Sequence, residues 1–301
     1  DLVLHRLTYM THALAGDEAD AQYLNDTGVV KALWWVQGVP SWAIALPQTV
    51  PTSGKACFSG AIYGDRQYWL EHPLLKEVVQ QEISPEYDVG LPGLYDQLNQ
   101  EIIALLQENE EFSQELLDRH LDALRLIRRR SFELWLKGLA RGTAVVNLPS
   151  FYQAYAGRVY EGMAAGRPVV SWEIPGRPRT KALFEDGKEI LLFPGDAPLK
   201  LSEQVQKLAQ DPSFAKKIVD NAHQKLSRNH TMEIRVRQFL AWIKSGVEPD
   251  YGVTGCNATD RDDIDSFYVD LWQDPSWSSP YPNADENMRW CKMSLILEKY
   301  Y

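Results

Sequence analysis

The feature that most limits the fold is a regular alternation of strand-like and helix-like segments between residues 55 and 245. Short apolar runs such as KACFSG, TAVVNL, PVVSW and EILLF have the length of buried strands, and amphipathic segments with helical spacing separate them. This alternation predicts an α/β fold with a parallel, doubly wound sheet. A ligand of such a sheet binds outside the carboxyl ends of the strands, so the loops that follow the strands are where site residues are expected.

Composition divides the 301-residue chain into three parts. Residues 1–50 are apolar, with the strand-like runs DLVLH and VVKALWWV, so we expect the remnant of an α/β domain that ends at the break PQTVPTSGK. Residues 51–245 are expected to form the alternating domain, and residues 246–301 a polar linker or wrapping segment. The chain opens in mid-pattern with DLVLH, so we expect a piece of a longer protein.

Charge and hydropathy exclude two classes of partner. The net charge is −10 and the isoelectric point is about 5.2, so the chain lacks the basic surface that a nucleic-acid binder needs. It has no apolar run long enough to predict a transmembrane segment. Its three cysteines are odd in number and widely spaced, which favours a reducing, cytoplasmic location.

The loop after the first strand of the alternating domain is one candidate site. In SGAIYGDR, Gly60 and Gly64 allow backbone N–H groups to approach a ligand closely. A helix predicted from Asp65 onward directs the positive end of its dipole at the same place, and Arg66 adds a charge. This combination suits a diphosphate, and it equally suits a structural turn between a strand and a helix.

The segment GRVYEGMAAGRPVV, residues 157–170, is the second candidate. Its small residues predict a short helix close to the sheet, which Gly166 ends before Pro168 begins a strand. We expect Glu161 in the first turn, where the helix dipole stabilises a carboxylate. There Glu161 can accept hydrogen bonds from the vicinal hydroxyls of a ribose, and Arg158 can bind a phosphate. An ordinary helix-start glutamate and a solvated arginine fit the same spacing.

The sequence YEGMAAGRPVV resembles the donor-site motif of GT-B fold glycosyltransferases, in the glycosyl transferases group 1 class and its spore-coat-protein-like branch. The resemblance continues through RTKALFEDGKEILLFPGDAPLKLSEQVQKLAQDPSF and RQFLAWI, which are similar to the closing part of that family's C-terminal, donor-binding domain. KACFSGAIYGDR resembles its first strand and diphosphate loop. The resemblance covers residues 55–243 and implies a Rossmann-like domain that binds a nucleotide sugar.

The resemblance also implies roles for single residues. Glu161 corresponds to the second glutamate of the family's Glu-x7-Glu pair, which binds the ribose of the donor. The first glutamate falls on Gln153, so the motif does not indicate whether the anomeric configuration is retained or inverted. Gln153 and Tyr155 are expected to hydrogen-bond hydroxyls of the donor sugar, and Gly157 to lie in the loop that meets the sugar and the phosphates.

The family further implies a metal-independent, hexosyltransferase-like enzyme of polysaccharide biosynthesis. In such an enzyme, backbone amides and cationic side chains stabilise the diphosphate leaving group. Arg66 and Arg158 are the first candidates for this role. Arg177, Arg179 and Lys181 in GRPRTK are secondary candidates, with a charged surface loop as the alternative. We therefore expect a nucleotide-diphosphate sugar as donor, a saccharide or other small acceptor, and no cofactor or metal.

Three further features leave alternatives open. His5 and His12 are candidate catalytic residues, because the family takes acceptor-side groups from its N-terminal domain, and scattered histidines without a shared role are the alternative. The acidic DRDDID at residues 260–265 follows no buried strand, so we expect no metal there. The tail FYVDLWQDPSW is similar to the lead-in of some class I methyltransferases, so a glycosyltransferase–methyltransferase fusion is one alternative function. A non-catalytic module that binds a nucleotide sugar or a partner is another.

Overall fold

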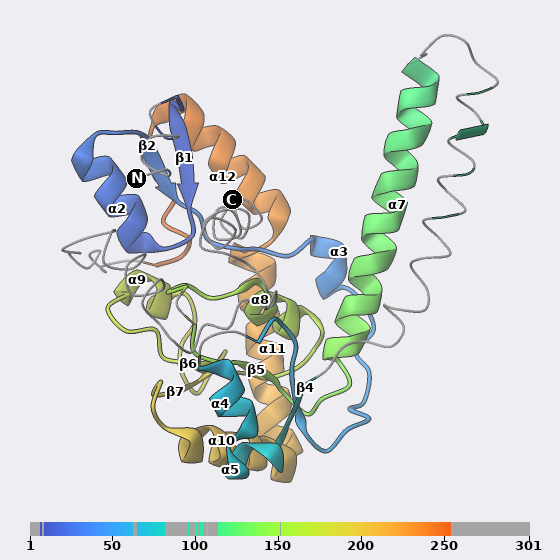
Figure 1. Cartoon of the computed structure of the whole chain (residues 1–301), viewed down its shortest axis with the longest axis vertical. Helices are drawn as coiled ribbons and strands as arrows, with labels where there is room; N and C mark the ends of the chain where they lie inside the picture. The colour runs from blue at the N-terminus through green and yellow to red at the C-terminus, as the bar shows by residue number, and fades with distance from the viewer. Residues whose placement is uncertain are drawn as a thin grey trace, which may run out of the picture.

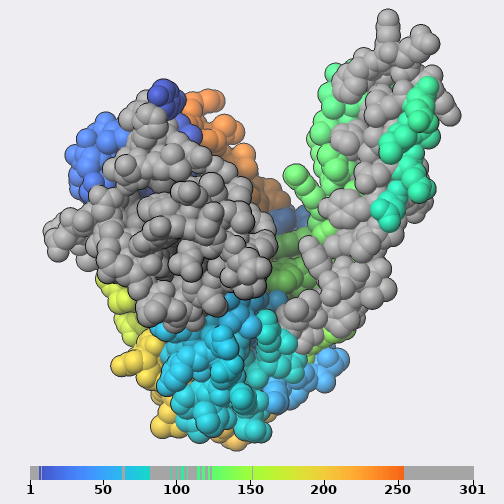
Figure 2. Space-filling model, viewed as in Figure 1, coloured from blue at the N-terminus to red at the C-terminus, as the bar shows by residue number. Residues whose placement is uncertain are grey.

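The computed structural model describes residue 7, residues 9–62, 65–81, 114–150 and 152–253, and the single positions 96, 100, 103, 104 and 107. Within this part the chain forms two parallel sheets with helices packed around them. A long helix, α7 (Gln114–Leu139), projects from this body and meets it at its C-terminal end (Figure 1). The space-filling view shows the same projection (Figure 2).

The larger sheet positions most of the candidate residues. Over the described residues it has five parallel strands in the order β4-β3-β5-β6-β7. The strands are β3 (Ala56–Phe58), β4 (Val79–Gln81), β5 (Val145–Asn147), β6 (Val169–Trp172) and β7 (Leu191–Phe193). β3, β5, β6 and β7 are buried at every position, as expected for strands with helices on both faces. The predicted doubly wound parallel sheet is therefore confirmed.

Helices connect and cover these strands. The short helices α4 (Arg66–Glu71) and α5 (Pro73–Lys76) connect β3 to β4. α10 (Pro198–Gln210) packs on α5, β6 and β7. α8 (Gly157–Ala164) connects β5 to β6, packs on both strands, and contacts α7 and α11 (Pro212–Asn229). The five-residue α9 (Pro178–Ala182) lies between β6 and β7.

The sheet changes direction between β3 and β5. From β3 the chain continues through α4 and α5 to β4 on one side, whereas β5, β6 and β7 follow one another on the other side. Cys57 of β3 pairs with Val145 of β5, so the loops after these two strands leave the same edge of the sheet together. In a doubly wound sheet the crevice for a ligand opens at such a switch point.

The small residues of α8 bring this helix close to the sheet, as predicted. A Cβ atom added to Gly162 would lie 2.8 Å from the Cβ atom of Val145, and Gly166, with φ of 71°, adopts the left-handed conformation just after the helix. The prediction that Glu161 lies in the first turn of this helix is wrong. The helix begins at Gly157, so Glu161 is its fifth residue, beyond the first turn in which the helix dipole acts.

A smaller unit lies before the larger sheet in the chain. Strands β1 (His12–Ala15) and β2 (Lys31–Trp34) pair in parallel, and α2 (Glu18–Thr27) connects them. α3 (Ser41–Ile44) leads out of the unit. β2 falls in a segment predicted as strand-like, whereas β1 was not predicted, and the strand expected at residues 1–5 lies outside the described residues.

The last described helix, α12 (Met232–Ser245), packs against this smaller unit (Figure 1). The ring centroid of Trp242 lies 5.1 Å from that of His12, and the buried Arg235 donates from Nε to the carbonyl oxygen of Val36 at 2.8 Å. Val39 accepts a backbone hydrogen bond from Met232 at 2.8 Å. α12 belongs to the segment predicted as the domain 51–245, yet it completes the unit formed by residues predicted as the domain 1–50. The domain boundaries themselves stay a prediction.

Candidate functional site

Arg66 ties together the two loops at the switch point. It is the first residue of α4 and only 2% exposed, and its guanidinium carbon lies 5.7 Å from the ring centroid of Phe58 at the end of β3. Its Nη1 atom donates to the carbonyl oxygen of Ala61 at 3.0 Å, in the loop after β3. Its Nε atom donates to the carbonyl oxygen of Pro149 at 3.4 Å, in the loop after β5. Arg66 therefore places a buried positive charge between the ends of β3 and β5. Asp65 occupies the predicted N-cap position, but its side chain makes no capping hydrogen bond.

Arg158 brings a second positive charge to the same place. It is the second residue of α8, and its guanidinium carbon lies 4.8 Å from the ring centroid of Phe58, the last residue of β3. The guanidinium carbon of Arg66 lies 5.7 Å from that same ring. The Arg158 guanidinium also occupies the space that a side chain at Gly60 would need. The structure thus brings Gly60, Arg66 and Arg158 together. Their role in binding a diphosphate stays a prediction.

Glu161 lies one turn after Arg158 on α8 and contacts α7. Its Oε2 atom accepts a hydrogen bond of 2.8 Å from Nε1 of Trp135. Its Oε1 atom lies 3.2 Å from the position that a Cβ atom at Gly157 would take. Burial raises the pKa of the Glu161 carboxyl above its ordinary value, while the Trp135 hydrogen bond and the charge of Arg158 oppose that shift. The site therefore contains a desolvated carboxylate beside an arginine.

Gln153 and Tyr155 precede α8 in the loop after β5. Gln153 is half-buried. Tyr155 is 3% exposed and its ring lies 5.8 Å from that of Phe184, in the hydrophobic core. Burial raises the pKa of the Tyr155 phenol, and the charges of Asp186 and Glu173 add to this shift. Tyr155 also lines a narrow cavity of about 10 Å³ between this loop and the end of β1, so its predicted contact with donor hydroxyls stays a prediction.

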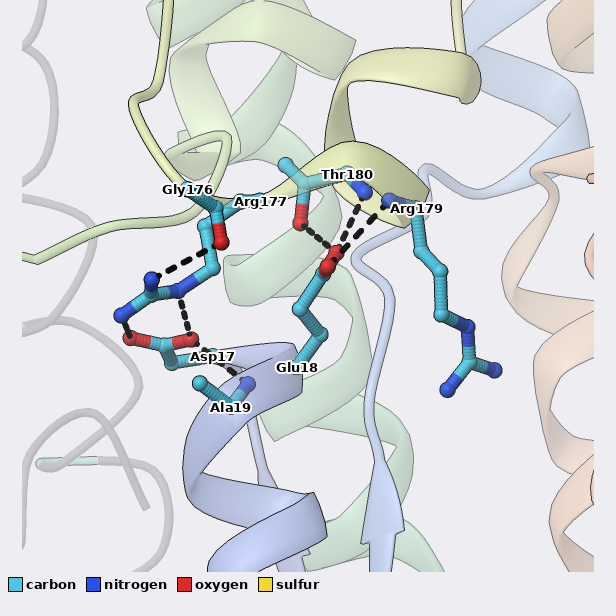
Figure 3. Close-up of polar contacts among 7 residues, drawn as sticks. All are labelled: Asp17, Glu18, Ala19, Gly176, Arg177, Arg179 and Thr180. Carbon is cyan, nitrogen blue, oxygen red and sulfur yellow. Dashed lines mark hydrogen bonds and ion pairs between the residues drawn. The ribbon is translucent and has the colours of Figure 1, made fainter. Parts of the chain in front are cut away.

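The secondary candidate Arg177 is bound by the smaller unit (Figure 3). Its Nε and Nη2 atoms donate to the two carboxylate oxygens of Asp17 at 2.5 and 3.0 Å, and both side chains are buried. Asp17 is also the N-cap of α2, where it accepts from the backbone N–H of Ala19 at 2.9 Å. Figure 3 shows Arg177 turned toward Asp17 across the junction of the two units.

Arg179 and Lys181 also have protein partners. The guanidinium carbon of Arg179 lies 4.5 Å from the ring centroid of Trp34, and its Nη2 atom is 3.4 Å from Glu248. Lys181 pairs with Glu173. Arg179 and Lys181 belong to α9, after β6, and do not join Arg66 and Arg158 beside Phe58. A phosphate role for Arg177, Arg179 and Lys181 stays a prediction.

Glu18 is a buried carboxylate that sequence reasoning missed. Its oxygen atoms accept from the backbone N–H groups of Arg179 at 3.2 Å and Thr180 at 2.5 Å, and from the Thr180 hydroxyl at 2.9 Å (Figure 3). Burial raises the pKa of Glu18, against the effect of these hydrogen bonds. The only signal in the sequence is the acidic pair Asp17 and Glu18 at the start of α2, which is typical of ordinary helix capping. Their partners lie about 160 residues away, so the sequence does not reveal them.

An open pocket of about 530 Å³ adjoins this junction. The segment 173–178 after β6 lines one side, and Pro194 and Gly195 after β7 line the other. Arg177 and Lys181 both border the pocket. It opens at the carboxyl edge of the sheet, two strands away from the switch point.

The remaining predicted residues are placed as follows. His12 is at the amino end of β1, hydrogen-bonded to Thr11 at 3.0 Å and packed edge-on against Trp242. It is therefore at the end of the strand opposite to the one where ligands bind in parallel sheets. The described residues do not include His5, Gly64 or residues 254–301, which contain the acidic segment 260–265. A catalytic role for either histidine stays a prediction.

The described residues contain neither a metal-binding cluster nor a membrane-spanning helix. No three side chains of the histidine, cysteine, aspartate and glutamate types gather there in a way that could hold a metal ion. None of the helices found in those residues has both the length and the apolar character needed to cross a membrane.

One part of the chain is similar in sequence to a known protein family. Residues 135–241 match the family described as "Glycosyl transferase-like". A D-inositol 3-phosphate glycosyltransferase of Streptomyces bingchenggensis is 28% identical over 82 residues, which span 27% of this chain and 17% of that protein.

Two solved structures have a similar arrangement over 81% of this chain. One is HepE from Anabaena in complex with UDP and glucose, with 13% identity, a TM-score of 0.48 and 66% of its own length covered. The other is sucrose-phosphate synthase from Thermosynechococcus elongatus, with 16% identity, a TM-score of 0.48 and 60% of its length covered. The chain thus spans less than two thirds of each of these proteins. The family match, over residues 135–241, covers β5, α8 and most of α12.

Proposed function

We propose that this protein is a glycosyltransferase that moves a sugar from a nucleotide-diphosphate donor to an acceptor, and that the larger sheet binds the donor. The observation that carries the proposal is the meeting of Arg66, Arg158 and Glu161 near the switch point of a domain in this family. Two cations and one carboxylate match the two chemically distinct parts of a nucleoside diphosphate, which are its phosphates and its ribose.

The two arginines are assigned to the diphosphate. Arg66 is fixed by carbonyl oxygens from both loops, so its charge is held in place before a ligand arrives. Arg158 packs on the same Phe58 ring, and the absence of a side chain at Gly60 leaves room for its guanidinium. As the donor bond breaks, negative charge grows on the leaving diphosphate, and preorganised cations stabilise it. Because two guanidiniums supply this charge, the proposed reaction needs no metal ion.

Glu161 is assigned to the ribose. A carboxylate accepts several hydrogen bonds, so it can bind two adjacent hydroxyl groups at once. Glu161 stands one helical turn from Arg158, which sets the ribose beside the phosphates. Gln153 stands where the family has an acid, so we assign it a neutral hydrogen bond from its amide to the donor sugar. Gly157 and Tyr155 are assigned to the loop around that sugar.

Calorimetric titration tests this assignment. We expect UDP or GDP to bind the wild-type chain, and UDP, which the HepE crystals contain, is the first probe. Arg158→Ala and Glu161→Ala should each weaken binding at least tenfold, as expected for hydrogen bonds to charged groups. Arg128→Ala, which removes an exposed arginine of α7, is the matched control and should bind as the wild type does. If no nucleoside diphosphate binds, or if both site variants bind as tightly as the control, the proposal is wrong.

One observation favours a second candidate function. Gln153 replaces a carboxylate, so a module that binds a nucleotide sugar without transferring it fits the same site. Incubating the chain with UDP-sugars and a panel of saccharide acceptors separates the two functions. Release of UDP that depends on the acceptor supports the enzyme, whereas tight binding without turnover supports the binding module.

A further inference from the structure

Trp135 is the one described side chain from outside α8 that the structure shows hydrogen-bonded to the Glu161 carboxylate. It lies near the C-terminal end of α7, between the buried residues Leu134 and Leu136, and its ring packs against the hydrophobic core. The indole is therefore held by its surroundings, and its N–H is directed at Oε2 of Glu161 at 2.8 Å. This contact joins α7 to α8 across 26 positions of the chain.

The chemistry of the indole suits a fixed support. The indole N–H is only a donor and does not titrate in the physiological range. The carboxylate of Glu161 is therefore always the acceptor in this hydrogen bond. Burying a carboxylate costs free energy unless hydrogen-bond donors satisfy it. This neutral donor lowers that cost and leaves the negative charge of Glu161 in place. A lysine or arginine in the same place would instead neutralise Glu161 and favour an ion pair over a ligand.

The other oxygen atom of the carboxylate lies next to a glycine. Oε1 of Glu161 lies 3.2 Å from where a Cβ atom at Gly157 would be, so any side chain at that position would crowd it. Gly157 is the first residue of α8 and borders the loop that follows β5. One carboxylate oxygen is thus held from the side of α7, while the other lies toward the loop at the switch point.

We propose that Trp135 is a positioning residue for ribose recognition: its indole N–H holds Oε2 of Glu161 so that the carboxylate presents its remaining lone pairs to the vicinal hydroxyls of a ribonucleotide. The inference rests on the proposed function and adds a substrate class to it, because a site built in this way selects ribonucleotides over 2′-deoxyribonucleotides. A purely structural link between α7 and α8 would contribute to stability without affecting that selection.

The preference for UDP over 2′-deoxy-UDP measures the ribose contact and cancels the contribution of the phosphates. We expect the wild type to bind UDP roughly tenfold or more tightly than 2′-deoxy-UDP. Trp135→Phe keeps an aromatic ring but removes the N–H, and it should reduce this preference to about threefold or less, with little change in the affinity for 2′-deoxy-UDP. Glu161→Gln should abolish the preference, and the double variant should resemble Glu161→Gln.

Trp42→Phe is the matched control. Trp42 is half-buried and its ring centroid lies 5.8 Å from that of Phe132 on the same helix, α7, so this change perturbs packing on α7 without touching Glu161. The control should keep the full preference for UDP. If Trp135→Phe keeps it as well while Glu161→Gln loses it, the positioning role is wrong and the proposed function stands. If the wild type binds neither nucleotide, the proposed function fails and this inference fails with it.

A second measurement does not require the Trp135 variant to fold. In ¹⁵N-labelled wild-type protein without ligand, one indole N–H resonance should shift as Glu161 is protonated, and this shift should be absent in Glu161→Gln. The groups that face this carboxylate are Trp135 on α7 and Arg158 on α8, and neither loses a proton in the same range. If no indole resonance differs in this way between the two proteins, Trp135 does not hold the carboxylate and the inference is overturned.

Discussion

Asp17 and Arg177 form a buried, two-pronged ion pair that joins the start of α2 to the loop after β6. With Glu18 and Thr180 beside it, this pair is a polar junction between the smaller unit and the larger sheet. The two partners are 160 positions apart in the sequence, so the contact exists only in the folded chain.

Removing the charge of Asp17 should destabilise the fold. Asp17→Asn keeps a good N-cap for α2 but leaves the buried guanidinium of Arg177 without a counter-charge. We expect the free energy of unfolding to fall by about 3 kcal/mol, measured by urea denaturation. Asp26→Asn, an exposed carboxylate on the same helix, should change it by less than about 0.5 kcal/mol. Equal stability of the two variants would show that the ion pair contributes nothing.

Glu18 should make stability depend on pH. Burial raises its pKa in the folded state, so the folded protein binds this proton more tightly than the unfolded chain does. The contribution of Glu18 is therefore greatest below the unfolded pKa of about 4.3, and it is lost as the pH rises through the folded pKa. Relative to Glu18→Gln, the wild type should lose stability across this window, beyond any constant offset from the altered hydrogen bonds.

Urea unfolding at a series of pH values above about pH 4 measures this difference for Glu18. Glu71→Gln, which removes an exposed carboxylate from α4, corrects for the loss of one surface charge. A difference between wild type and Glu18→Gln that grows as the pH falls, in favour of Gln, would have the opposite sign and contradict the prediction.

Gly60 should control ligand affinity through Arg158. In Gly60→Ala the added methyl group meets the end of a flexible side chain, so the guanidinium of Arg158 moves, and the φ of 154° at this position adds some backbone strain. We expect UDP affinity to fall about tenfold, because one charged hydrogen-bonding group is displaced. Gly54→Ala is the control, since a Cβ atom there meets nothing within 4 Å. Calorimetry should find the Gly60→Ala/Arg158→Ala double variant no weaker than Arg158→Ala, and additive losses would rule out this coupling.

Gly162 should be intolerant of even one methyl group. Alanine in place of glycine normally stabilises a helix interior by up to about 1 kcal/mol. Here its Cβ atom would lie 2.8 Å from the Cβ atom of Val145 in the central strand β5, so Gly162→Ala should instead destabilise the protein by about 2 kcal/mol. Thermal and urea denaturation check the sign. Val145→Ala removes the two methyl carbons that lie 3.0 Å from the added atom and keeps the Cβ atom, so it relieves part of the crowding. The double variant should therefore be less destabilised than the sum of the two single changes.

The sequence predicted those parts of the fold whose signal is local. The β-branched runs identified β5 and β6, and the small residues of the segment 157–170 identified a helix packed tightly on the sheet. β1 was missed because HALA has no β-branched or aromatic residue. The position of Glu161 was wrong because spacing fixes the periodicity of a helix better than its first residue.

The candidate site was predicted only where its residues lie close to a motif. Gly60, Arg66 and Arg158 could be selected from their loops, and the structure brings them together around Phe58. Trp135 carried no such signal, because a tryptophan in an amphipathic helix looks like a core residue and only the folded structure shows its N–H directed at a carboxylate. Asp17 and Glu18 were missed for the same reason, since the partners that distinguish them from ordinary capping residues come from the far half of the chain.

The packing of α12 on β1 and β2 has a consequence for biosynthesis. The hydrogen bond between Arg235 and Val36 spans 199 positions, and Tyr251 donates to the carbonyl oxygen of Trp34 from a still later position. During translation, nearly the whole described chain must therefore be synthesised before α12 can pack on the smaller unit. Until then the apolar surface that α12 covers is exposed, and a chaperone or another nascent chain can bind it. We therefore expect this unit to fold late and to be the part most prone to aggregation.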